Sequence, residues 1–187
     1  MPSVLVAYAT KYGSTQEIAE AVAETVREHG LDVDVRSARD VKAVDGYSAV
    51  VLGAPLYYFR WHKDARKFLD RHRKALSGLP VAVFAVGPME DKPEQFEDSR
   101  ARLDKALAKR EWLAPVAVTV FGGRFDPAIL RFPDNNPGMK NIPASDIRDW
   151  DAIRAWAAGL PDAMGLGSST TSETSETAET SEDQPRS

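Results

Sequence analysis

Near its N-terminus the chain reads Val4-Leu-Val-Ala-Tyr-Ala-Thr-Lys-Tyr-Gly-Ser-Thr-Gln-Glu-Ile-Ala19. Its first five residues form an apolar run that is too short for a helix, and a loop of hydroxyl side chains and one glycine follows. From Ile18 onward, apolar residues recur at every fourth position, which is the spacing of one helix face. The segment therefore predicts a strand, a loop and a helix in direct succession.

The loop at residues 10–15 has the properties of a phosphate site. Its backbone N–H groups and the positive end of the helix dipole converge on one point, and the hydroxyls of Thr10, Ser14 and Thr15 add neutral donors. It lacks both the Gly-Lys-Ser/Thr ending of a nucleoside-triphosphate loop and the three spaced glycines of a dinucleotide loop. The sequence thus favours a phosphate ligand of another kind.

A second interpretation of the same hydroxyls is helix capping. Ser14 or Thr15 could serve as the N-cap of the helix, with Glu17 close enough to assist. Because hydroxyl-capped helices follow strands in many α/β proteins, the sequence leaves both interpretations open.

Composition limits the chemistry that the chain can carry. Its 187 residues, 43% of them hydrophobic, are enough for one sizeable core and too few for two comfortable domains. The absence of cysteine excludes disulfides, thiolate catalysis and iron–sulfur ligation, so any redox chemistry requires a bound cofactor. No segment approaches the roughly 20 apolar residues of a membrane span, and no histidine spacing indicates a metal site. We expect a cytoplasmic protein.

Charge divides the chain into two parts. Residues 168–187 contain five acidic side chains and one arginine, which accounts for the whole net charge of −4 and leaves residues 1–167 neutral. We predict one folded domain over residues 1–164 and a disordered acidic Ser/Thr-rich tail over residues 165–187. The neutral body and the lack of a recognition motif argue against nucleic-acid binding.

The rest of the body alternates strands with helices. Apolar runs at residues 31–35, 48–53, 81–86 and 116–121 predict four further strands. Helical patterns at residues 61–75, 94–110 and 145–160 lie between or after them, which is typical of a parallel sheet covered by helices. The irregular segment 128–145 is unusually long for a connection, so we expect it to border the functional site.

Aromatic residues follow the third predicted strand, in the stretch Gly53-Ala-Pro-Leu-Tyr-Tyr-Phe-Arg-Trp-His62. In an open parallel sheet, ligands bind beyond the carboxyl ends of the strands, so this loop is expected beside the phosphate loop. There, Tyr57 and Tyr58 could hold a flat heterocycle between flat rings.

Four motifs together resemble the flavodoxin-domain family that includes the quinone-dependent protoporphyrinogen oxidases of bacteria. They are Thr10-Lys-Tyr-Gly-Ser-Thr15, Val51-Leu-Gly-Ala-Pro-Leu-Tyr57, Lys92-Pro93 and Asp149-Trp150, and the resemblance covers residues 1–160. It implies a flavodoxin-like three-layer α/β sandwich, with a five-stranded parallel sheet of order 2-1-3-4-5 and helices on both faces. It also implies noncovalent FMN at the point where the strand order reverses.

The resemblance assigns site residues to the two ends of the cofactor. The phosphate would be held by Thr10, Lys11, Tyr12, Gly13, Ser14 and Thr15. The ring system would be held by Pro55, Leu56, Tyr57, Tyr58, Gly87, Pro88 and Met89. No pair of side chains in the sequence is placed for acid–base or nucleophilic catalysis, so we assign no catalytic residue.

Three functions are compatible with these expectations. The first is an FMN-dependent oxidoreductase, such as one of haem biosynthesis, that exchanges electrons with a small molecule or a quinone. The second is an electron carrier that serves redox protein partners, and the third is a flavin-free module that binds another anion or a protein. Because carriers of this type tend to be strongly acidic, the neutral body favours the enzyme.

Overall fold

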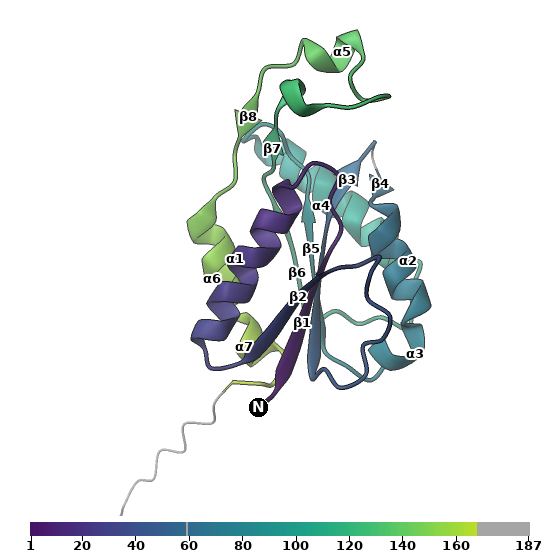
Figure 1. Ribbon diagram of the computed structural model, residues 1–187, viewed down its shortest axis with the longest axis vertical. Coiled ribbons are helices and arrows are strands. Elements are labelled where there is room, and N and C mark those ends of the chain that lie inside the picture. The colour runs from purple at the N-terminus through teal and green to yellow at the C-terminus, as the bar shows by residue number, and fades with distance from the viewer. Residues whose placement is uncertain (59, 168–187) are drawn as a thin grey trace, which may run out of the picture.

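Five parallel strands form the centre of the fold, in the order β2-β1-β3-β5-β6 (Figure 1). The computed structural model describes residues 1–58 and 60–167. The strands are β1 Ser3–Tyr8, β2 Asp32–Ser37, β3 Ala49–Tyr57, β5 Val81–Val86 and β6 Ala117–Phe121. A short strand, β4 (Arg60–Trp61), pairs antiparallel with the end of β3. With β4 set aside, this is the predicted order 2-1-3-4-5.

The burial of each strand follows its sequence pattern. All six residues of β5 and the first seven of β3 are buried, because helices cover both faces of the central strands. In β2, exposed Asp32 and Asp34 alternate with buried Val33 and the partly buried Val35, as expected of a strand at the sheet edge.

Helices cover the sheet on two sides, which gives three layers (Figure 1). One side carries α1 (Ser14–Glu28), α6 (Trp150–Ala158) and α7 (Leu160–Ala163), and their apolar faces share one core cluster with the sheet. The other side carries α2 (Lys63–Arg71), α3 (Arg73–Leu76) and α4 (Pro93–Ala108), around a second core cluster. The predicted α/β sandwich is confirmed.

The helix predicted at residues 61–75 differs in the structure. Trp61 belongs to β4, opposite Leu56, and its indole Nε1–H donates to the carbonyl of Ala54 at 3.1 Å. The helix α2 begins only after His62, whose Nδ1 accepts a hydrogen bond from the N–H of Asp64. In this position Trp61 is only 1% exposed.

The last predicted helix begins later than residue 145. Ser145–Asp146 forms β8, which pairs antiparallel with β7 (Arg124–Phe125). The helix α6 begins at Trp150 because the Asp149 carboxylate accepts the N–H of Ala152 at 2.9 Å, and so caps it.

The packed chain continues past Gly165, where the sequence predicts the tail to begin. Leu166 packs against the core cluster of α1 and α6, and its N–H donates to the carbonyl of Pro161 at 2.7 Å. The remainder of the predicted tail, residues 168–187, lies outside the described residues.

Candidate functional site

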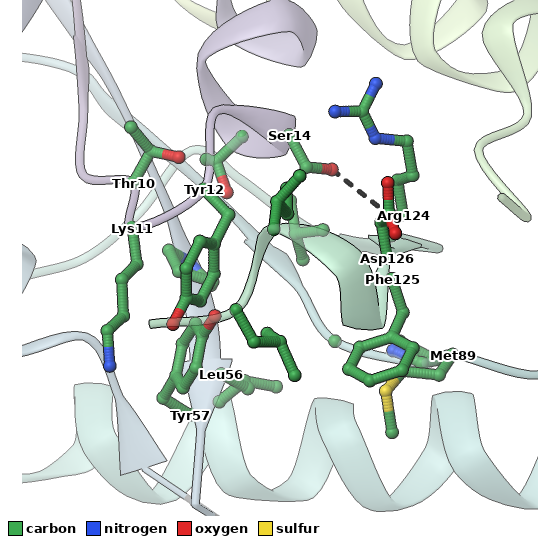
Figure 2. Close-up of a pocket in the computed structure, with 18 residues that line it drawn as sticks. Thr10, Lys11, Tyr12, Ser14, Leu56, Tyr57, Met89, Arg124, Phe125 and Asp126 are labelled. Carbon is green, nitrogen blue, oxygen red and sulfur yellow. Dashed lines mark hydrogen bonds between the residues drawn. The ribbon is translucent and has the colours of Figure 1, made fainter. Parts of the chain in front are cut away.

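The loops after β1, β3, β5 and β6 meet at the carboxyl edge of the sheet and line a cleft (Figure 2). The cleft brings together residues that the sequence assigned to both ends of one ligand. These are Thr10, Lys11, Tyr12, Ser14, Thr15, Pro55, Leu56, Tyr57, Gly87, Pro88 and Met89. Gly13 shapes the loop without lining the cleft, and Tyr58 lines an adjoining hollow.

The N-terminus of α1 opens toward this cleft without a side-chain cap. Its N-cap residue is Gly13, in the left-handed conformation with φ 90°, and within residues 1–58 and 60–167 no side-chain hydrogen bond caps the helix. Thr10 Oγ1 accepts the N–H of Gly13 at 2.9 Å and so fixes the loop. The capping interpretation of Ser14 and Thr15 is therefore wrong.

Ser14 has a different partner, shown by the dashed line in Figure 2. Its Oγ accepts the N–H of Arg124 at 3.2 Å, which ties the first loop to the loop after β6. The guanidinium of Arg124 lies 3.7 Å from Glu17, and Arg148 contacts the same carboxylate. The acidic side chain in the first turn of α1 is thus neutralised, which leaves the helix terminus attractive to an anion.

Aromatic and apolar side chains form the walls farther from α1. Tyr12 and Tyr57 lie on one side of the cleft with their ring centroids 6.3 Å apart, and Phe125 and Met89 lie on the other (Figure 2). Burial raises the pKa of the Tyr57 phenol, so this side chain stays neutral. Such walls suit a flat, largely apolar group.

A second hollow adjoins the first and shares several of its walls. The first has a volume of about 100 Å³ and the second about 390 Å³. Both are lined by Leu56, Tyr57, Met89, Phe125 and Leu130. The second is completed by α4 and by the long loop that carries η1 (Pro127–Ile129) and α5 (Pro137–Lys140). The long loop therefore borders the site, as its length predicted.

Asp134 is a site residue that sequence reasoning missed. Only 2% of it is exposed, and it accepts hydrogen bonds from Lys11, Tyr12 and Tyr58. Burial opposes its ionisation, but these donors hold its pKa below the usual carboxyl value. An irregular segment has no hydrophobic periodicity from which the position of a single aspartate could be predicted. The only available signal was that Asp134 lies in the long loop, which was expected to border the site.

Phe125, Ile129 and Leu130 also line the cleft without having been predicted. The paired glycines at residues 122–123 were the available signal for a close approach to a ligand at this point. Within residues 1–58 and 60–167, no three acidic or histidine side chains are grouped to hold a metal ion. In the same residues, no helix is long and apolar enough to cross a membrane.

Comparison with known proteins gives a family match over most of the chain. A family model described as flavodoxin domain matches residues 5–136. The protoporphyrinogen IX dehydrogenase (quinone) of Escherichia coli strain K12 is 26% identical over 132 residues, which cover 69% of this chain and 70% of the relative. An NAD(P)H dehydrogenase (quinone) of Acidovorax ebreus strain TPSY is 30% identical over 111 residues, 45% of this chain and 56% of that relative.

Solved structures show the same fold at lower identity. A flavodoxin from the domain Archaea aligns with a TM-score of 0.55 and 17% identity, over 87% of this chain and 99% of the other. A short-chain flavodoxin associated with a bacterial microcompartment aligns with a TM-score of 0.56 and 18% identity, over 87% and 98% of the two chains.

Proposed function

Because the chain belongs to the flavodoxin-domain family, we propose that the cleft binds FMN noncovalently and that the protein is an FMN-dependent oxidoreductase. The proposed cofactor-binding domain covers the predicted residues 1–164 and continues to Leu166, which packs against its core, and we propose a cytoplasmic location. The observation that carries the proposal is the uncapped N-terminus of α1, which opens onto a cleft with aromatic walls.

The phosphate end fits this terminus. The first amides of a helix have no partner within the helix, and here no side chain supplies one. Thr10 and Thr15 add hydroxyls at the cleft wall. Lys11 and Tyr12 would contribute backbone N–H groups only, because their side chains bind Asp134. The phosphate would therefore be held by neutral donors and the helix dipole.

The ring end fits the apolar walls. The flat ring would lie between the walls that the two hollows share, among them Tyr57, Met89 and Phe125. At Gly87, a Cβ would lie 2.8 Å from Ser99 Oγ and 3.0 Å from Leu56 Cδ1, so a larger residue would have to displace these side chains at the wall. When bound, FMN supplies the electron and hydride transfer, and these walls orient its ring and exclude water.

The second hollow favours an enzyme over an electron carrier. A carrier needs an exposed cofactor edge and a docking surface, whereas an oxidoreductase needs space for an organic molecule beside the ring. The hollow of about 390 Å³, lined by Met139 and Tyr58 beside the shared walls, offers that space. We assign no catalytic side chain.

The quinone-linked relatives support a finer proposal on the reaction. The Escherichia coli relative is named for protoporphyrinogen IX and a quinone, and the Acidovorax relative for NAD(P)H and a quinone. We propose a small organic electron donor and a quinone-type acceptor for this protein, with a protoporphyrinogen as the first donor to test. A redox protein partner is the alternative acceptor.

We expect the purified protein to contain FMN, or to take it up stoichiometrically. Acid release followed by mass spectrometry identifies the ligand, and fluorescence titration of the apo-protein with FMN checks the uptake. Another nucleotide, or no binding after reconstitution, would refute the cofactor and leave the flavin-free module.

The same preparation separates an enzyme from a carrier. Anaerobic mixing with a protoporphyrinogen should bleach the flavin absorbance near its visible maximum, and a soluble quinone should restore it over repeated cycles. If neither small molecule reacts and only redox proteins exchange electrons with the flavin, the protein is a carrier.

Replacing Thr10 tests the phosphate end. Thr10 Oγ1 already accepts the N–H of Gly13, so its O–H is left to donate to the phosphate. Thr10→Ala should weaken FMN binding by about 1.5–3 kcal/mol, or roughly ten- to a hundredfold. Thr10→Ser is the matched control and should retain most of the affinity. Equal losses for FMN and for riboflavin, which lacks the phosphate, would contradict this role.

A further inference from the structure

One buried carboxylate connects three separate parts of the cleft. Asp134 lies in the long loop between η1 and α5 and is only 2% exposed. Its partners come from two other loops, Lys11 and Tyr12 after β1 and Tyr58 after β3. The contacts to Lys11 and Tyr12 span more than 120 residues of sequence.

The geometry of these contacts uses both carboxylate oxygens. Oδ2 accepts from Lys11 Nζ and from the Tyr12 hydroxyl, each at 2.5 Å, and Oδ1 accepts from the Tyr58 hydroxyl at 3.1 Å. A buried charge is tolerated only when it is paired and hydrogen-bonded, and both conditions are met. Lys11 Nζ is further enclosed by the rings of Tyr57 and Tyr12, at 5.4 and 5.6 Å from their centroids.

Further hydrogen bonds hold Asp134 and its partners in place. The N–H of Asp134 donates to the carbonyl of Arg131 at 2.8 Å, and the N–H of Arg131 donates to the Tyr12 hydroxyl at 3.4 Å. Tyr58 has φ 42°, a left-handed conformation that is unfavourable for a bulky residue. The hydrogen bond from Tyr58 to Asp134 helps to offset that cost.

We propose that Asp134 is a positioning residue for the cofactor, which holds the long loop of residues 126–144 closed across the cleft and fixes the phosphate loop relative to the ring loop. The inference rests on the proposed function and extends it. The long loop supplies Ile129 and Leu130 to the cleft and Met139 to the adjoining hollow, so its opening would uncover the ring end. Departure of the cofactor then requires that the contacts of Asp134 break.

Asp134→Asn removes the charge at nearly constant size and should accelerate FMN dissociation about tenfold or more, with little change in the association rate. In the flavin-free protein, amide hydrogen exchange over residues 126–144 should rise by a similar factor, while exchange in the central strands stays unchanged. Tyr58→Phe removes a single hydroxyl and should give a smaller change in the same direction.

Asp70→Asn is the matched control. Asp70 binds Arg110 through two hydrogen bonds of 2.8 Å, so the Asp70→Asn variant also loses an ion pair. Asp70 lines neither the cleft nor the adjoining hollow. FMN dissociation and exchange in the long loop should match those of the unaltered protein.

A double-mutant cycle separates positioning from general destabilisation. Lys11→Met should accelerate dissociation as Asp134→Asn does, and the double variant should be no faster than the faster single variant. Additive effects, or unchanged exchange over residues 126–144 in Asp134→Asn, would overturn the proposal. Because exchange is measured without flavin, a protein that binds no FMN but whose loop opens in Asp134→Asn would contradict the proposed function while supporting closure by Asp134.

Discussion

Gly13→Asp is expected to weaken FMN binding by at least a hundredfold, whereas Gly13→Asn should retain most of the affinity. Gly13 is the N-cap of α1 with φ 90°, and a Cβ at this position would meet no atom within 4 Å. Asn and Asp are the L-residues that best tolerate the left-handed region, so both variants should fold with a similar cost of about 1–2 kcal/mol.

The two variants differ in charge alone, and that difference should decide FMN binding. Two like charges about 4 Å apart repel by about 4 kcal/mol at the effective dielectric constant of a protein surface. The aspartate would add its charge at the N-cap position of α1, the terminus proposed to attract the phosphate. The phosphate of FMN carries the negative charge that the aspartate would repel, and riboflavin has no phosphate.

Fluorescence titration of both variants with FMN and with riboflavin measures the effect. Gly13→Asp should leave riboflavin affinity close to that of Gly13→Asn, and the melting temperatures of the two flavin-free variants should agree. If Asp and Asn weaken FMN equally, the loop does not bind the phosphate, and the cofactor orientation proposed above is wrong.

Gly53→Ala is expected to lower the free energy of unfolding by about 3 kcal/mol, a large effect for one methyl group. Gly53 lies in β3 opposite Phe84 of β5, and a Cβ there would overlap the tip of the Phe84 ring. That ring is fully buried, with its centroid 5.7 Å from that of Phe121 and 6.0 Å from that of Trp156. Because its neighbours are closely packed, the Phe84 ring has no space to move away from an added methyl group.

Urea unfolding of the variant and of two companions measures this effect. Gly78→Ala is the control, because the nearest atom to its Cβ is the Ala75 carbonyl oxygen at 3.8 Å, and its stability should change by less than about 0.5 kcal/mol. Adding Phe84→Leu to Gly53→Ala removes the ring tip and should recover part of the loss. A Gly53→Ala protein as stable as the Gly78→Ala protein would show that β3 and β5 can shift to accommodate the methyl group.

The sequence by itself determined the order of the five main strands and the position of the hydroxyl-rich loop after the first of them. Both are local properties, because apolar runs such as Val81–Val86 indicate buried strands and a hydroxyl-rich segment with one glycine before an amphipathic pattern indicates a loop that leads into a helix. The order 2-1-3-4-5 came from the family resemblance, and the structure confirms it.

Only the tertiary structure decided which polar groups pair across the cleft. Ser14 looked like a helix cap, yet its hydroxyl accepts from Arg124, 110 residues away. Asp134 stood in an irregular segment without periodicity, and its partners are known only once the loops after β1 and β3 meet at the sheet edge. Gly53 ended the third predicted strand, and only the structure shows that it lies within β3, where its absent side chain makes room for Phe84. Long-range pairing depends on how the layers pack, and local sequence pattern carries no record of that packing.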